Sequence, residues 1–233
     1  MEKYYPSLLK CPLFSNISEH DFPTLLFCIN ASLRKYKNDE YLFLAGDEVN
    51  YIGILISGSL ELIKENPAGA QHIVSFLEPT NLFAEAIVCT RNRISPVSLI
   101  ARGDCEVLLI PYEKIIKTCS NACGFHLQLI RNMMIILGER NNGLFFKIEL
   151  LTIKSMREKI ATYLLLESQK QNALLFQIIP NRNELADYLN VSRTSMCREL
   201  SRMKDLGLID YYQNSFKILS VDGLQRCLLP SDE

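Results

Sequence analysis

The sequence predicts an α+β protein made of a β-rich N-terminal region, one long helix, and a small C-terminal region of helices and a hairpin. Three observations predict this order. Short apolar segments separated by turn residues occupy positions 32–112, a proline-free apolar repeat follows from Asn121 to Ser155, and short capped helices come last. This succession is typical of two folded domains joined by a helix. We expect three parts, at 1–118, 119–154 and 155–233.

The N-terminal region has the strand spacing of an antiparallel sandwich or barrel. Its apolar segments are short, recur at intervals of roughly 8–12 residues, and are separated by Gly, Asn and Asp. We expect turns at Gly46-Asp47, Ser57-Gly58-Ser59, 66–69 and Gly103-Asp104. The expected strands are Tyr41–Leu44, Tyr51–Ile56, Leu60–Ile63, Ile73–Leu77, Val97–Ile100 and Glu106–Ile110.

The middle region predicts a helix that pairs with a second copy of itself. Apolar residues alternate at spacings of three and four, as in a coiled-coil seam, and a helix over Phe125–Leu151 would be about 40 Å long. The stripe is narrow, and its one polar member, Asn141, is of a type that fixes register in parallel pairs. We expect a homodimer; a buried core helix is the alternative. The predicted dimer seam consists of Leu127, Ile130, Met134, Leu137, Asn141, Leu144, Ile148 and Leu151.

The segment from Pro180 to Ile209 has the pattern of a helix-turn-helix. Asn181 followed by Glu184 predicts an N-cap with a reciprocal partner, and Ser192 caps a second helix. In the second helix, apolar residues recur at spacings of four and three, which leaves its arginines and hydroxyls facing outward. The second helix of such a motif enters the DNA major groove. Its inward-facing residues are Met196, Leu200 and Met203.

The residue types on the second helix suit DNA recognition. Arginine matches guanine O6 and N7, and each such pair discriminates by about 1–3 kcal/mol, while hydroxyls at helix N-termini hold phosphates. A solvated charged face on an ordinary helical hairpin is the alternative. A predicted hairpin, Asp210–Tyr212 and Ser215–Leu219, follows as a wing and favours DNA binding. The predicted DNA-contacting residues are Ser192, Arg193, Thr194, Ser195, Arg198 and Arg202.

The composition limits the possible functions. Of 233 residues, 48% are hydrophobic and 22% charged, as in ordinary globular proteins, and the net charge of −1 excludes binding to nucleic acid by bulk attraction alone. No apolar run reaches the roughly 18 residues of a membrane-spanning helix, and the first residues do not form a secretory signal. We therefore expect a cytoplasmic protein with no membrane partner.

Together these segments resemble the cyclic-AMP receptor protein and fumarate–nitrate regulator (Crp/Fnr) family of bacterial transcription regulators. The resemblance covers nearly the whole chain and rests on Ser57-Gly58-Ser59, on Leu82–Glu85 and on Ala186–Arg198. It implies a β-roll (jelly roll) of the cyclic-nucleotide-binding type, a dimerisation helix and a winged helix-turn-helix. It also implies a homodimer on a palindromic operator in double-stranded DNA, and contact with RNA polymerase if the protein is an activator.

The resemblance also assigns roles in DNA binding. It implies that Arg193 and Arg198 contact bases or phosphates. The family often has Glu next to the first of these arginines, whereas this chain has Thr194. Because a threonine methyl group prefers a thymine neighbour, we expect an altered operator preference.

The resemblance implies an effector pocket in the β-roll, but the residues argue against cyclic AMP. Cyclic-nucleotide binders of the family carry Gly-Glu and then Arg-Ser or Arg-Thr, whereas this chain has Ala84-Glu85 and Ser95-Pro96. A buried phosphate needs a cation, and the nearby arginines are shifted in sequence. We expect a different small organic effector of unknown identity, anionic or aromatic. A purely structural Glu85, with no ligand at all, is the alternative. The predicted pocket residues are Phe83, Ala84, Glu85, Arg91, Arg93, Ser95, Leu137, Leu144 and Phe145.

The eight cysteines are scattered, and without an export signal we expect reduced thiols. Cys11 and Cys28 stand alone, so we do not expect an iron–sulfur cluster, which needs four thiolates. Cys119 and Cys123 share a helical face, but two ligands do not complete a metal site, and we expect none. No cysteine has the setting of a catalytic nucleophile, so we expect no enzyme. Two alternatives to an effector-gated regulator stay open. One is a redox-responsive regulator of the same family that uses cysteine thiols, and the other is a ligand-binding module with a protein partner.

Overall fold

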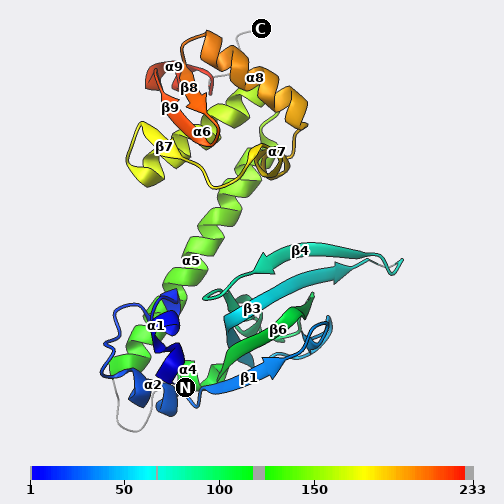
Figure 1. Ribbon diagram of the computed structural model, residues 1–233, viewed down its shortest axis with the longest axis vertical. Helices are drawn as coiled ribbons and strands as arrows, with labels where there is room; N and C mark the ends of the chain where they lie inside the picture. Colours follow the sequence, from blue (N-terminus) through cyan, green and yellow to red (C-terminus); the bar gives the residue numbers. More distant parts are fainter. Residues whose placement is uncertain (1, 67, 118–123, 229–233) are drawn as a thin grey trace. The chain divides into compact units, whose positions relative to one another are not determined.

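The computed structural model describes residues 2–66, 68–117 and 124–228 (Figure 1). The chain forms two compact units, Met1–Arg140 and Asn141–Glu233, and the long helix α5 (Gly124–Thr152) contributes to both. The predicted division at 118 and 154 stays a prediction, and Cys119 and Cys123 lie outside the described residues. Within the described ranges, no helix combines the length and apolar character needed to cross a membrane.

The N-terminal unit is built around one antiparallel sheet with the strand order β1-β6-β3-β4, with β2 paired to β6 and β5 paired to β3. Its strands are β1 (Ser32–Tyr36), β2 (Tyr41–Phe43), β3 (Tyr51–Glu65), β4 (Gln71–Leu77), β5 (Leu82–Phe83) and β6 (Ser98–Pro111). Its short helices are η1 (Glu2–Tyr4), α1 (Tyr5–Leu8), η2 (Pro12–Phe14), α2 (Phe22–Cys28), α3 (Glu85–Val88) and α4 (Tyr112–Ile116).

Two of the expected turns are bulges inside long strands, so the prediction of separate strands there was wrong. Gly58 lies within β3 and Gly103 within β6, and the two strands pair on both sides of the irregularity. The pairing passes from Ser57 opposite Glu106 to Ser59 opposite Arg102, so β6 contributes the extra residues. Both glycines lie in the left-handed region, with φ of +89° and +83°. Glycine marks a bulge as well as a turn, and only the partner strand decides which one forms.

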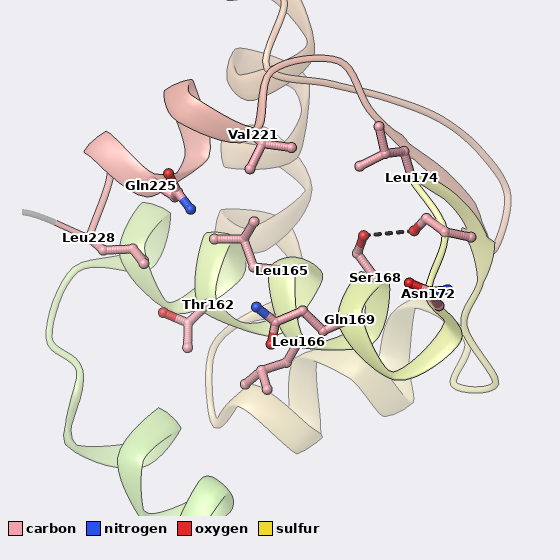
Figure 2. A pocket seen from close by; sticks show the side chains of 11 residues that line it. Thr162, Leu165, Leu166, Ser168, Gln169, Asn172, Leu174, Val221, Gln225 and Leu228 are labelled. Atoms are coloured by element: carbon pink, nitrogen blue, oxygen red, sulfur yellow. Dashed lines mark hydrogen bonds between the residues drawn. The ribbon is translucent and has the colours of Figure 1, made fainter.

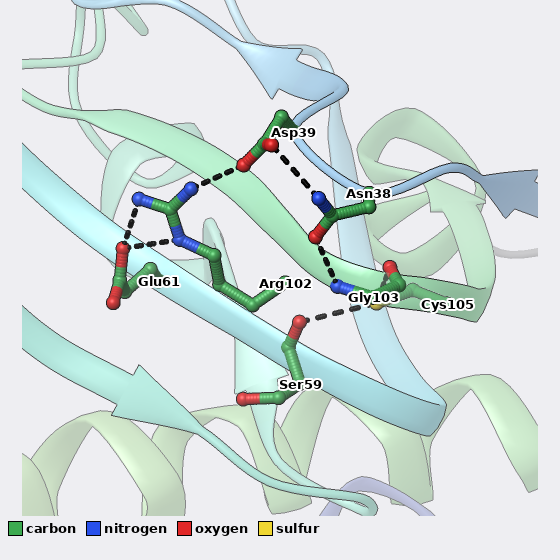
Figure 3. A network of polar contacts seen from close by, with 7 residues as sticks. All are labelled: Asn38, Asp39, Ser59, Glu61, Arg102, Gly103 and Cys105. Atoms are coloured by element: carbon green, nitrogen blue, oxygen red, sulfur yellow. Dashed lines mark hydrogen bonds and ion pairs between the residues drawn. The ribbon is translucent and has the colours of Figure 1, made fainter.

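An ion-paired network stabilises the sheet beside the bulge (Figure 3). Nε of Arg102 donates to the carboxylate of Glu61 at 2.6 Å, and the same guanidinium pairs with Asp39. The side-chain oxygen of Asn38 accepts from the backbone N–H of Gly103 at 2.7 Å. Because Glu61 is buried, its pairing with Arg102 satisfies a charge that would otherwise destabilise the sheet.

The first half of α5 packs on the core of the N-terminal unit. The side-chain amide of Asn132 is buried and donates to the backbone carbonyls of Leu13 and Ser15, both at 2.8 Å. These bonds fix the rotation of the helix, so that a second stripe of residues faces away from this core. The apolar side chains of α5 buried in the core are Leu129, Met133 and Ile136.

The C-terminal unit is a helix-turn-helix followed by a two-stranded wing, which confirms the predicted α+β class. Its helices are α6 (Met156–Gln171), α7 (Arg182–Leu189), α8 (Arg193–Asp205) and α9 (Val221–Arg226). Its strands β7 (Leu175–Gln177), β8 (Ile209–Tyr212) and β9 (Ser215–Ile218) form an antiparallel sheet in the order β7-β9-β8.

Candidate functional site

The two helices of the helix-turn-helix begin and end where the sequence places their caps. The side chain of Asn181 accepts from the N–H of Glu184 at 3.1 Å, and the carboxylate of Glu184 accepts from the N–H of Asn181 at 2.8 Å. Asn190 then ends α7 in the left-handed conformation, with φ of +52°. The hydroxyl of Ser192 caps α8 by accepting from the N–H of Ser195 at 3.2 Å. The predicted capping box and the predicted second cap are confirmed.

The outer face of α8 carries exposed polar side chains. Its underside is fully buried, as predicted, through Met196, Leu200 and Met203. We call the exposed side chains of Arg193, Thr194 and Arg198 the recognition surface. Among the described residues, neither of these two arginines has an ion-pair partner. The predicted contact residues Ser192, Ser195 and Arg202 are also exposed.

Arg202 differs from the other two arginines because it faces a carboxylate. Glu199 is buried in α8, and its two oxygens pair with Arg157 of α6 at 2.6 Å and with Arg202 at 3.4 Å. Sequence reasoning assigned no role to Glu199, although its spacing of three from Arg202 is a local signal of such a pair. Arg202 therefore presents less free positive charge than Arg193 and Arg198.

The wing lies next to the N-termini of both helices. Its turn at Gln213-Asn214 is where the sequence predicts it, and Gln213 is left-handed, with φ of +49°. A cavity of about 670 Å³ is lined by residues of the turn and of the helix N-termini, and no acidic residue is among those that line it. The lining residues are Gln177, Asn181, Arg182, Asn183, Arg193, Tyr212, Gln213, Asn214 and Ser215.

In the N-terminal unit, Phe83, Ala84 and Glu85 form what we call the β5–α3 corner. Gly53 of β3 lies opposite Phe83, and a Cβ atom at Gly53 would come within 1.8 Å of the Phe83 ring, so the close packing requires glycine there. Ala84 adopts the left-handed conformation, with φ of +66°. This backbone turns the chain from β5 into α3 and places the first residue of α3, Glu85, in the interior.

The carboxylate of Glu85 is 1% exposed and pairs with Arg140 of α5, whose side chain is 49% exposed. Nη2 of Arg140 also approaches the carbonyl oxygen of Leu82 at 3.4 Å, and burial lowers the pKa of Arg140. Oε2 of Glu85 has no hydrogen-bond partner among the described residues. Arg140 was missed from the sequence because nothing local links two residues on distant segments. Arg140 is therefore the positively charged partner of the buried carboxylate in the β5–α3 corner.

The other predicted pocket residues are described by their own contacts and exposure. Arg93 donates to Asn50 at 3.0 Å and to Glu113 at 3.1 Å, and its guanidinium lies 5.0 Å from the centre of the Tyr112 ring. Ser95 is buried and its hydroxyl bonds to a backbone carbonyl within its own loop. Arg91, Leu144 and Phe145 are exposed, and Leu137 is half-buried against the core. The membership of these residues in an effector pocket stays a prediction.

Two of the other cavities among the described residues lie close to features already described. One of about 490 Å³ adjoins Arg140 and is lined by Lys10, Pro12, Thr80, Asn81, Leu82, Ile136, Glu139 and Arg140. The other, of about 470 Å³, lies in the C-terminal unit between the end of α6 and α9 (Figure 2), and it has no charged lining residue. There the hydroxyl of Ser168 donates to the carbonyl of Ala173 at 2.7 Å. None of the residues lining the second cavity belongs to α7, α8 or the wing.

The predicted seam of α5 is largely exposed. Leu127, Met134, Leu144 and Ile148 are 58–69% exposed, and Leu151 is 44% exposed. Ile130 and Leu137 are half-buried and Asn141 is exposed. Most of this stripe is therefore apolar surface that the described chain leaves uncovered.

Comparison with known proteins identifies both units. A cyclic nucleotide-binding domain model matches residues 33–122, and a Crp-like helix-turn-helix model matches residues 158–227. The transcriptional activator protein anr of Pseudomonas aeruginosa is 27% identical over 201 residues, covering 84% of this chain and 79% of that protein. The cAMP-activated global transcriptional regulator CRP of Pasteurella multocida is 23% identical over 192 residues, covering 80% and 90%. Both relatives are transcription regulators rather than enzymes.

A solved structure shows the same fold. The catabolite activator protein of Thermus thermophilus superimposes with a TM-score of 0.52 and 22% identity, covering 93% of this chain and 98% of that chain. The strand-rich domain, the long helix and the helix-turn-helix follow in the same order in this chain. The chain is therefore a transcription regulator of the Crp/Fnr family, with a cyclic-nucleotide-binding-type domain before a DNA-binding helix-turn-helix domain.

Proposed function

We propose that this regulator acts as a homodimer on a palindromic DNA operator, and that a small effector other than cyclic AMP controls its binding. The observation that carries the proposal is the recognition surface. Arg193, Thr194 and Arg198 project from the first turns of a helix whose underside is fully buried. Side chains in this place reach base edges when such a helix enters the major groove.

The exposed stripe of α5 supports the dimer. Exposure of an apolar stripe at heptad spacing to water is energetically unfavourable. In a parallel pair, a second α5 covers this stripe. Asn141, exposed in the single chain, then faces its counterpart and fixes the register. Two copies of α8 placed about 34 Å apart match successive major grooves on one face of DNA.

The β5–α3 corner supports an effector other than cyclic AMP. Glu85 is held by Arg140, and the guanidinium of Arg93 is held by Glu113 and Asn50. Neither of these arginines is left free for a cyclic phosphate. The neighbouring cavity contains Lys10 and the exposed part of Arg140 as cations and Glu139 as one carboxylate, so it suits a small organic anion held mainly by Lys10 better than a nucleotide that needs Glu85 unpaired.

The DNA-binding proposal is tested by mobility shift of the full-length protein on a library of palindromic sites, with and without cell extract as a source of effector. We expect retardation of a selected site, and a loss of about tenfold or more in affinity for Arg198→Ala. Arg226→Ala, an exposed arginine on α9, is the matched control and keeps wild-type affinity. If no DNA is retarded under any of these conditions, the proposal is overturned.

The dimer and the effector are tested separately. Sedimentation equilibrium is expected to give a dimer for the wild type and a monomer for Ile148→Glu, which places a charge in the seam.

Calorimetric titration of the wild type with cyclic AMP is expected to show no binding. The proposal of a different effector would be overturned if the wild type bound cyclic AMP and Glu85→Gln did not. Recruitment of RNA polymerase to the retarded complex would identify an activator.

A further inference from the structure

Arg182, the first residue of α7, contacts the wing through its guanidinium group. Nη2 of Arg182 donates at 2.8 Å to the backbone carbonyl of Gln213 in the wing turn. The guanidinium carbon lies 5.1 Å from the ring centre of Tyr211 on β8 and 4.7 Å from that of Phe216 on β9. These two rings belong to residues that pair directly across the wing. One side chain therefore contacts both wing strands and the turn between them.

This position is costly for a cation. Nη1 of Arg182 is buried without a hydrogen-bond partner among the described residues, and burial lowers the pKa of the group. Stacking on two rings and the bond to a carbonyl offset part of the desolvation. An apolar side chain would fill the same space without that cost. Arginine adds a directional hydrogen bond, because its planar donors hold the carbonyl of Gln213 in one place.

The residue that Arg182 holds is one whose backbone needs support. Gln213 has φ of +49°, a region that long side chains rarely occupy. A turn with this conformation gains stability when a partner binds its carbonyl. Lys204 supports the same wing from α8, since its Nζ lies 2.7 Å from the carboxylate of Asp210 on β8.

We propose that Arg182 is a positioning residue for DNA binding: it fixes the wing turn against the N-terminus of α7 and does not itself contact DNA. This inference rests on the proposed function, because the wing is placed for contact with DNA beside the recognition surface. The opposite assignment for Arg182 is a direct contact with a DNA phosphate through the neighbouring cavity.

The experiment compares full-length wild type, Arg182→Met and Arg182→Lys. The first readout needs no DNA: backbone hydrogen exchange at Gln213, Asn214 and Ser215 is expected to rise about tenfold or more in Arg182→Met. Exchange in the β-roll is expected to stay unchanged. Arg182→Lys keeps the positive charge and can still donate a hydrogen bond, but it loses the planar fork of donors, so its exchange is expected to fall between the two. This variant also covers the case in which Arg182→Met folds poorly.

The second readout is a double-mutant cycle on operator affinity. Arg182→Met and the wing variant Tyr212→Ala are each expected to weaken binding about tenfold, and together little more than either one alone. Two results together would overturn the proposal: Arg182→Met keeps the wild-type exchange rates at the wing, and its loss of operator affinity adds to that of Tyr212→Ala. Arg182 would then contact DNA itself. If wild type binds no DNA, the proposed function fails, whereas the exchange measurement still tests whether Arg182 holds the wing.

Discussion

The recognition surface and the β5–α3 corner are both expected to meet a ligand, and their polar groups are arranged in opposite ways. On α8, Arg193 and Arg198 are exposed without ion-pair partners among the described residues. At the corner, Glu85 is almost fully buried and paired with Arg140. The first surface needs no rearrangement to bind. The second is closed by an internal ion pair, so a ligand that engages Glu85 has to compete with Arg140, and breaking a buried pair is costly.

The largest expected effect comes from breaking that pair. Arg140→Met leaves the carboxylate of Glu85 buried without a cation, so we expect a loss of about 2–3 kcal/mol of unfolding free energy. This is less than for a fully buried pair because Arg140 is half-exposed. The chain has no tryptophan, so urea unfolding is best followed by circular dichroism at a fixed protein concentration.

Two further variants sharpen this measurement. Arg131→Met removes an exposed arginine from the same helix and is expected to change stability by less than about 0.5 kcal/mol. Glu85→Gln combined with Arg140→Met removes both charges and is expected to recover most of the loss. A loss in Arg140→Met no larger than in Arg131→Met would mean that the corner is not held by the pair.

A smaller effect is expected on the recognition surface, in specificity rather than stability. Thr194 is exposed, so Thr194→Glu is expected to leave the unfolding free energy within about 0.5 kcal/mol. A glutamate accepts a hydrogen bond from a cytosine amino group, whereas the threonine methyl favours thymine, with about 1–3 kcal/mol of discrimination. Operator selection with both proteins measures the change, and Thr194→Val, which keeps a methyl group, is the control. An unchanged preference would contradict a role for Thr194 in base recognition.

The last expected effect appears only in alkaline solution and concerns the sheet rather than the DNA-binding unit. Burial raises the pKa of Tyr51 to about 12, and its hydroxyl donates to the carbonyl of Leu42 at 3.1 Å. The folded protein therefore keeps this proton longer than the unfolded chain, so its contribution to stability is complete below pH 10 and falls as pH rises from 10 to 12. Urea unfolding between pH 9 and 12 is expected to show a shallower decline for Tyr51→Phe than for wild type. Tyr212→Phe, on an exposed residue, is expected to decline like wild type.

The two units also differ in how far the sequence could predict them. The caps at Asn181 and Ser192 and the buried face of α8 are local signals, since each depends on residues three or four positions apart. The bulges at Gly58 and Gly103 depend instead on how two distant strands pair. The same holds for Arg140 with Glu85, which are far apart in sequence. Such contacts follow from the assembled sheet and helix, and no spacing along the chain reports them.

The buried Glu199 has a consequence for how the protein moves among DNA sites. By holding Arg157 and Arg202, it removes positive charge from the surroundings of the recognition helix. Attraction to arbitrary DNA depends on the number of phosphates that cations neutralise. With Arg157 and Arg202 already paired, we expect weak binding to unrelated sequence and a shallow dependence of that binding on salt concentration. Discrimination between an operator and other sequence is then expected to depend mainly on base contacts.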